Sequence, residues 1–467
     1  MNPHFSEWVY LQIAYLFPHW SRDAQNHLLD QILEGDAAQS KTGRLALFAA
    51  RQARLRDEHV RFQGPWLRRL KDFFSTLQLR RGLKSAGKGG QSRSVHLKVN
   101  PGGPRILHAI PDFMVGGAAQ LVYDIVAHSQ HTGPQIIYAS RATHRPPSGL
   151  PARIHTYTTK IAAQRLLERN SPDLVHFCHY DLLDYQGSWS RGILSAAEHL
   201  GIPIVQTHCV IGEPWLGSHT QNVVYCSNWS ASTFGASWLQ ESVIYPGTPI
   251  KLFKGDYRAP RKLPVVGMAY RLGGDKMDVT SAYAVAEVLR QVPNARMRIV
   301  GKGTLEESFR QIFREYGCQD RVEWLGWLEL EDLRNFYRSL DLVLAPVITD
   351  TFGSGSVHAI VSGRPVLGPR TGALPEILRS PDALTPPLGI IPNGLRFTLG
   401  QEPLTSKNRA EPTNLDSPAA FGRQAAALLK NPDLHLAVHQ IQLKHAEATF
   451  TVERMVERYE SLFAATV

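Results

Sequence analysis

The chain has 467 residues, of which 43% are hydrophobic and 20% are charged, a composition typical of a globular protein with two or three domains. Its longest early apolar run, WVYLQIAYLF, is about half of the ~20 residues that a membrane-spanning helix needs, so we expect neither a transmembrane segment nor a signal peptide there. The net charge of +10 is concentrated in residues 1–100, where 16 Lys and Arg accompany 8 Asp and Glu. The basicity therefore belongs to an N-terminal appendage and says little about the main body.

The four cysteines lie in different segments without CxxC spacing, which argues against a disulfide framework or a structural zinc site. Such cysteine usage is typical of a reducing compartment, so we expect a cytoplasmic protein. These residues are Cys178, Cys209, Cys226 and Cys318.

Residues 1–102 form the first predicted domain, a basic helical extension that ends in the linker KSAGKGGQSRS. Residues 66–84 within it predict a basic amphipathic helix. Two interpretations stay open: the helix packs on the main body with its charges in water, or it contacts an anionic membrane surface peripherally. We find no nucleic-acid-binding module there and predict no nucleic-acid partner. The apolar stripe consists of Trp66, Leu70, Phe73 and Leu77.

Residues 103–257 alternate short apolar runs with helical patterns, which predicts parallel βαβ units in a doubly wound sheet. The chain-order elements are RILHAI, a helix with Ala118, Leu121, Val122 and Ile125 on one face, QIIYAS, DLVHFC, a helix over 190–200, IPIVQTH and NVVYCS.

Residues 258–440 repeat this alternation after the joint YRAPRKLP, and residues 441–467 form a last helix in a helical region that begins at 418. Two facing Rossmann-like domains bind ligands where the carboxyl ends of their strands meet, so we expect the site between them. The predicted elements are VVGMAY, a helix over 279–291, ARMRIVG, a helix over 304–316, RVEWLG, a helix over 330–339, LDLVLAP, RPVLG and a polar loop over 404–417.

Two loops follow the first strands of the two sheets. In MVGGAAQ, Gly116 and Gly117 are either a plain turn or a close approach of backbone to an anion at a helix N-terminus. In YRLGGDK, Arg271 and Lys276 are either solvated loop charges or a pair that binds a diphosphate, the first as a fork and the second as a point charge.

Polar residues also follow two later strands. His208 ends IPIVQTH and is either packed there or directed at a ligand. In DTFGSGSVHAI, Gly353 and Gly355 keep a loop open whose amides can face a phosphate or a hydroxyl. Asp350 before this loop is either a cap or an acceptor for sugar hydroxyls, and His358 after it is either a half-buried helix residue or a ligand contact.

Taken together, these motifs resemble the retaining glycosyltransferases of family 4, which have the GT-B fold. The resemblance covers about residues 105–467 and implies two facing Rossmann-like domains, the first for the acceptor and the second for a nucleotide-sugar donor. The last helix would cross back onto the first domain. The motifs are the GG turn, THC, VIYPGTPIKLF, RLGGDK, RIVGKG, VEWLGW, LDLVLAPVITDTFG, GRPVLGPRTGALPEIL and FTVERMVERYESLF.

By this resemblance, Arg271 and Lys276 would hold the donor diphosphate, with Gly117 beneath it and the amides near Gly353 and Ser354 around it. His208 would touch the donor sugar or its phosphate. The family's Glu-x7-Glu pair falls on Asp350 and His358, so the first position keeps a carboxylate and the second replaces one with an imidazole.

The implied activity is transfer of a sugar from a nucleotide-sugar donor with retention of configuration, with no metal and no cofactor. Because the Glu-x7-Glu positions depart from the family pattern, the alternative is a catalytically silent subunit that binds sugar nucleotides or partners. The acceptor is a glycan, a lipid-linked molecule or a small molecule, and the sequence names neither it nor the sugar or base.

Overall fold

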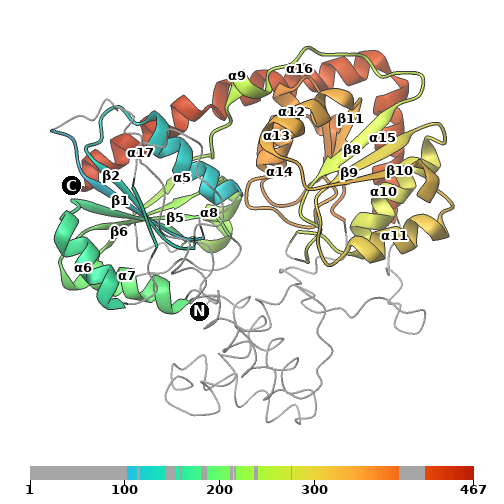
Figure 1. Cartoon of the computed structure of the whole chain (residues 1–467). Helices are drawn as coiled ribbons and strands as arrows, with labels where there is room; N and C mark the ends of the chain where they lie inside the picture. Colours follow the sequence, from blue (N-terminus) through green and yellow to red (C-terminus); the bar gives the residue numbers. More distant parts are fainter. Residues whose placement is uncertain are drawn as a thin grey trace, which may run out of the picture.

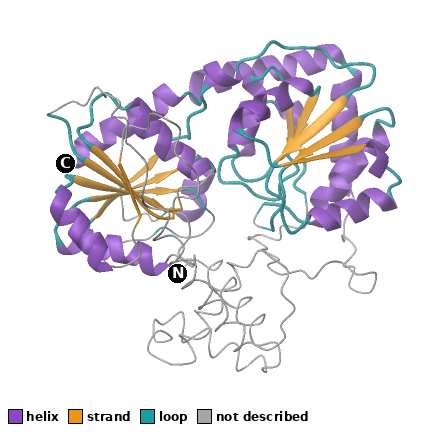
Figure 2. Ribbon diagram, viewed as in Figure 1, coloured by secondary structure: helices purple, strands orange, loops and turns teal. Residues whose placement is uncertain are grey.

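The computed structural model shows two sheet domains (Figures 1 and 2). The amphipathic helix predicted over 66–84 and most of the polar loop predicted over 404–417 lie outside the described residues. The structure describes residues 102–112, 116–141, 153–156, 160–179, 187–210, 214, 217–235, 240–274, 276–388 and 416–467.

Seven parallel strands make up the first sheet. In space they follow the order β3-β2-β1-β4-β5-β6-β7. Short apolar runs predicted most of them, whereas β3 and β7 had no such signal because they are short edge strands. The strands are β1 (Ile106–Asp112), β2 (Gln135–Arg141), β3 (Arg153–Thr156), β4 (Leu174–His179), β5 (Ile204–His208), β6 (Thr220–Tyr225) and β7 (Glu241–Val243).

Helices cover both faces of this sheet, so its strands are buried on both sides. Along β1, Ile106 and Ile110 pack toward one pair of helices, while Leu107 and Ala109 pack toward the other. This alternation follows from the two-residue period of a strand. Figure 1 shows α5 beside α17 on one face and α6 beside α7 on the other. The helices are α5 (Gly117–His128), α6 (Lys160–Asn170), α7 (Gly187–His199), α8 (Asn228–Phe234) and α17 (Val452–Thr466).

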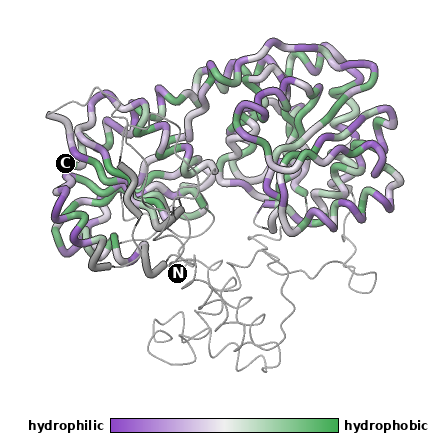
Figure 3. The backbone as a smooth tube through the Cα atoms, viewed as in Figure 1, coloured by the Kyte–Doolittle hydropathy of each residue, from purple (hydrophilic) through white to green (hydrophobic). Residues whose placement is uncertain are grey.

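Six parallel strands form the second sheet, in the order β10-β9-β8-β11-β12-β13. Hydrophobic backbone runs through the middle of both sheets, with more polar segments outside (Figure 3). The strands are β8 (Val265–Ala269), β9 (Arg296–Val300), β10 (Val322–Gly326), β11 (Leu342–Leu344), β12 (Val366–Pro369) and β13 (Leu384–Thr385).

The helices predicted over 279–291 and 330–339 are confirmed, and the one predicted over 304–316 spans 306–315. The first begins with a capping box in which the Asp278 side chain accepts a hydrogen bond from the amide of Thr280. The helices are α9 (Ile250–Phe253), α10 (Val279–Gln291), α11 (Glu306–Glu315), α12 (Leu330–Ser339), α13 (Ser354–Val361), α14 (Leu374–Leu378), α15 (Asp416–Lys430) and α16 (Pro432–Thr449).

Two segments connect the domains, and they pair with each other. Thr248 forms an isolated parallel bridge with Thr451, and its amide donates to the carbonyl of Phe450 at 2.7 Å. After this point α17 packs on α5, and Met455, Val456, Tyr459 and Phe463 join the core of the first domain. The last helix therefore completes a domain whose other elements begin about 350 residues earlier in the sequence.

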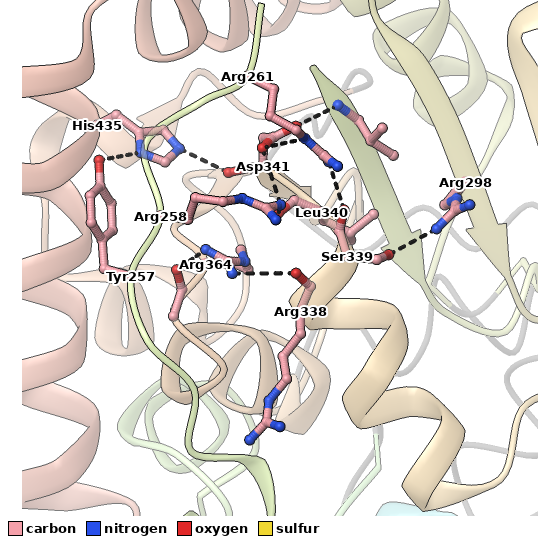
Figure 4. Close-up of polar contacts among 12 residues, drawn as sticks. Tyr257, Arg258, Arg261, Arg298, Arg338, Ser339, Leu340, Asp341, Arg364 and His435 are labelled. Carbon is pink, nitrogen blue, oxygen red and sulfur yellow. Dashed lines mark hydrogen bonds and ion pairs between the residues drawn. The ribbon is translucent and has the colours of Figure 1, made fainter. Parts of the chain in front are cut away.

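The segment after α9 is held by an arginine cluster at the amino end of the second sheet (Figure 4). Arg258 and Arg261 converge on the carboxylate of Asp341, which is fully buried and also accepts from the amide of Val265 at 2.7 Å. Burial, together with neighbouring Arg258, lowers the pKa of the Arg364 guanidinium to about 10. These contacts lie at the strand ends opposite the predicted site.

Candidate functional site

The N-termini of two helices, one from each domain, face each other where the domains meet. Helix α5 begins at Gly117 after its N-cap Gly116, and both glycines are exposed. Helix α13 begins at Ser354 after Gly353, whose φ of 90° favours glycine. A Cβ atom on Gly117 would lie 3.9 Å from Ser354 Oγ. Because free amides and the helix dipoles favour negative charge, this junction suits an anion.

A lysine and an aspartate from separate loops meet beside this junction. Lys276, on the loop after β8, places Nζ 2.8 Å from Oδ1 of Asp350, on the loop after β11. The Asp350 side chain is only 2% exposed, whereas that of Lys276 is 31% exposed. The second carboxylate oxygen, Oδ2 of Asp350, is buried without a hydrogen-bond partner among the described residues. The pair thus presents a partly solvated cation over a buried acceptor.

The loop that carries Asp350 is held in place by its neighbours. The carbonyl of Asp350 accepts from the amide of Ala373 at 3.0 Å, and Thr371 Oγ1 donates to the carbonyl of Ile348 at 2.6 Å. Gly372 has a φ of 53°, and a Cβ there would lie 2.3 Å from the Asp350 carbonyl oxygen. Only glycine allows this approach, so the TGA segment serves as the support of the Asp350 loop.

Arg271 is exposed on the same loop as Lys276, at the carboxyl end of β8. The loop lies against the turn after β9, where the Leu272 amide donates to the carbonyl of Lys302 at 3.0 Å. A Cβ on Gly303 would lie 2.1 Å from the Leu272 carbonyl oxygen, which explains the second glycine of the motif RIVGKG. The structure therefore brings Arg271 and Lys276 to the predicted edge of the sheet.

His358 lies on α13 and is half-buried. Its ring stacks on that of Phe253 in α9, with centroids 4.0 Å apart and planes 5° from parallel. Burial lowers the pKa of His358 to about 4, so the imidazole is neutral near pH 7. A neutral imidazole in this place can still donate or accept one hydrogen bond.

His208 occupies the carboxyl end of β5, but its side chain is fully buried. Its ring packs edge-on against Tyr225 at 5.6 Å and Phe234 at 5.7 Å. This packing differs from the exposed ligand contact that the family resemblance implies. A donor would reach the His208 ring only after these aromatic side chains move.

Two functional candidates, Tyr270 and Glu376, escaped the sequence analysis. The Tyr270 hydroxyl lies 3.0 Å from Ser356 Oγ, at the first turn of α13, and burial raises the pKa of Tyr270. Glu376 accepts from the amide of Trp229 at 2.6 Å and from the Tyr245 hydroxyl at 2.8 Å, and so ties α14 to the first domain. These partners lie more than 80 residues apart in sequence, so no local pattern signals them.

Residues 264–389 match the family described as Glycosyl transferases group 1. This match covers all six strands of the second sheet. The D-inositol 3-phosphate glycosyltransferase of Corynebacterium efficiens is 30% identical over 151 residues, which are 29% of this chain and 36% of that protein. The chain thus matches only about a third of the length of this curated relative.

Solved structures resemble a much larger part of the chain. HepE of Anabaena, in complex with UDP and glucose, has a TM-score of 0.59 at 16% identity and covers 78% of this chain and 100% of its own. Sucrose-phosphate synthase of Thermosynechococcus elongatus has a TM-score of 0.59 at 15% identity, with 78% and 100% coverage. The predicted fold, two facing Rossmann-like domains of the GT-B type, is confirmed.

None of the helices in the described part is both long and apolar enough to cross a membrane. Within the same residues, no group of three or more His, Cys, Asp and Glu side chains is arranged to hold a metal ion.

Proposed function

We propose that the protein is a retaining glycosyltransferase that moves a sugar from a nucleotide-sugar donor to an acceptor without a metal ion. The observation that carries the proposal is the junction of two helix N-termini next to Lys276, of which Lys276 and α13 lie within the residues that match the group 1 glycosyltransferase family. Support also comes from the likeness to a structure that was solved with UDP and glucose. The acceptor is a glycan, a lipid-linked molecule or a small molecule.

In this proposal the donor diphosphate lies at the junction, held by Arg271 and Lys276 and by amides at the start of α13. Charge develops on the diphosphate as the bond to the sugar breaks. Two cations and two helix N-termini oriented in advance stabilise that charge, which is the role that a metal has in other enzymes. The leaving phosphate takes the proton of the acceptor hydroxyl on the same face of the sugar, so retention follows without a second carboxylate.

Asp350 and His358 have separate roles in the proposed site. Asp350 orients Lys276 through the 2.8 Å ion pair, and its second oxygen, which is buried without a partner among the described residues, accepts from a sugar hydroxyl once the loop moves to admit the donor. The neutral imidazole of His358, which is stacked on the ring of Phe253, offers one hydrogen bond to a ribose hydroxyl. In that role the imidazole replaces the carboxylate of the family pattern without adding a charge next to a diphosphate.

Isothermal titration calorimetry with UDP, GDP and ADP tests this proposal. Lys276→Ala removes one charge-assisted contact, so the diphosphate that binds best should bind about 30- to 100-fold more weakly, or about 2–3 kcal/mol, while its nucleoside is unaffected. Lys262→Ala is the matched control, because this lysine precedes β8 and lies at the opposite end of the same strand.

Equal affinity of wild type and Lys276→Ala for every diphosphate would exclude the assignment of the site. Hydrolysis of the corresponding UDP-, GDP- or ADP-sugar by the wild type separates an enzyme from a silent subunit. Binding without any hydrolysis or transfer would favour the subunit.

A further inference from the structure

Three of the four cysteines lie together at the carboxyl ends of three strands of the first sheet. Cys178 lies in β4, Cys209 directly follows β5 and Cys226 directly follows β6. These strands are neighbours in the sheet, so residues far apart in sequence reach the same place. The Cys209 side chain interacts with those of both other cysteines.

The register of the strands places the three thiols on one face. His208 pairs with Tyr225, so Cys209 and Cys226 are the next residues along adjacent strands. Thr207, two residues before Cys209 and therefore on the same face, is hydrogen-bonded at 2.8 Å to Tyr459 of α17. The thiols thus lie beneath the helix that crosses from the second domain.

The three thiols differ in access to solvent. Cys178 and Cys226 are 1% and 2% exposed, whereas Cys209 is half-buried. Of the three residues, Cys209 is therefore the most exposed. The thiols of Cys178 and Cys226 can both donate to a thiolate at Cys209, and these contacts lower the pKa of Cys209 against the effect of burial.

Geometry selects one partner for Cys209. Adjacent strands are separated by about 4.8 Å, which lies within the Cα separation of about 4.4–6.8 Å that a disulfide needs. Cys178 pairs with Thr207 rather than with Cys209, so its Cα lies diagonally about 8 Å from that of Cys209. Cys226, the next residue in the register of the adjacent strand, is therefore the partner that Cys209 can reach with the smaller movement of the backbone.

Cys209 also contacts the loop of the proposed donor site. Its carbonyl oxygen accepts from Thr351 Oγ1 at 2.9 Å, and Thr351 directly follows Asp350. The Cys226 thiol donates to the His208 carbonyl at 3.2 Å. Closure of a bond between Cys209 and Cys226 would remove that thiol contact and turn the Cys209 backbone away from Thr351.

We propose that Cys209 and Cys226 form a peroxide-sensitive thiol pair that closes reversibly and loosens the loop of Asp350. The sulfur of Cys209 attacks a hydroperoxide ROOH, which gives a sulfenic acid and releases ROH. The Cys226 thiol then displaces the hydroxyl group, which leaves as water while the S–S bond forms. The two thiols lose two electrons and the peroxide gains them, and a dithiol reductant reverses the change.

Peptide mapping of the full chain under non-reducing conditions, after treatment with hydrogen peroxide, tests the site directly. Wild type and Cys318→Ser should each lose two thiols and yield one cross-linked peptide pair containing Cys209 and Cys226. Cys318 is the matched control, since it is buried in the other domain and away from the cluster. Cys226→Ser should stop at a sulfenic acid on Cys209 that reacts with a 1,3-diketone.

A cross-link to Cys178, or thiol loss of equal size in Cys209→Ser, would overturn the proposal. The mapping of wild type needs no variant to fold, and Cys209→Ala provides a second substitution. Neither result depends on the proposed glycosyltransferase function.

The effect on the loop rests on that proposed function and is measured separately. Oxidised wild type should bind the preferred nucleoside diphosphate about tenfold more weakly, the equivalent of one neutral hydrogen bond, and dithiothreitol should restore binding. Peroxide should leave the affinity of Cys209→Ser unchanged. A disulfide that leaves affinity unchanged would refute the effect on the loop, whereas reduced wild type that binds no diphosphate would refute the proposed function alone.

Discussion

The two sheet domains have the same doubly wound architecture but different interiors. The second domain has one large apolar core, and its arginine cluster lies at the amino ends of its strands. The first domain contains a buried hydrogen-bonded chain from Gln135 through His108 and His176 to Thr207 and Tyr459, with the cysteine cluster nearby. Burial lowers the pKa of both histidines, so the chain is neutral.

This difference shows that one topology can be stabilised in two ways. The second domain contains its own core and matches a family of known glycosyltransferases over residues 264–389. The first domain relies on α17, from the far end of the chain, to cover its polar chain and complete its apolar face. Loss of α17 would expose apolar surface and would also remove Tyr459, the partner of Thr207 in the buried polar chain. The second loss is costly because buried polar groups need partners.

The largest expected effect tests this dependence. Phe463→Ala and Phe309→Ala each remove a fully buried ring, so each should lower the free energy of unfolding by about 3–5 kcal/mol. Hydrogen exchange resolved by domain should place the loss in the first domain for Phe463→Ala and in the second for Phe309→Ala. If Phe463→Ala lost hydrogen-exchange protection only in the second domain, that result would contradict the role of α17.

An intermediate effect concerns Asp124 in α5, which is 2% exposed and has its Oδ2 buried without a partner in the described structure. Burial raises its pKa to about 7 from an ordinary value near 3.8. The folded state therefore prefers the protonated acid, and stability falls as pH rises from about 4 to 7, by up to about 4 kcal/mol.

Asp124→Asn removes this ionisation, so thermal denaturation at pH 8 should show a more stable protein by about 1–3 kcal/mol, with a smaller gain at pH 5. Asp173→Asn is the matched control, because Arg105 lowers the pKa of that carboxyl through a 2.9 Å ion pair. The control should be no more stable than wild type at pH 8. A gain for Asp124→Asn that is independent of pH would rule out the titration.

The smallest effect sharpens the picture of the second domain. His358→Ala removes one neutral hydrogen bond to the proposed donor, so calorimetry should show about tenfold weaker binding of the preferred diphosphate. His439→Ala is the control, since this buried imidazole also stacks on an aromatic ring, that of Tyr257, but on the linker side. Equal losses in the two variants would assign His358 to packing alone.

The sequence alone determined most helices and strands and the presence of two successive sheet domains along the chain. The pattern over 279–291 predicted α10 to its ends, because the residues that form this helix and the Asp278 that caps it are neighbours in the sequence. The strand pattern VVGMAY also placed Arg271 and Lys276 of the following motif after the first strand of the second sheet. The edge strand β3 went unpredicted, since its four residues are too few to show a period.

Only the tertiary structure decided which of these residues meet. Lys276 contacts Asp350, 74 residues later, and the cysteines that appear scattered in the sequence gather on neighbouring strands. His208 shows the reverse, since the family resemblance placed it at the donor while packing against Tyr225 and Phe234 buries it. A sequence records spacing along the chain, whereas contact and burial depend on strand register and on helices that arrive from elsewhere.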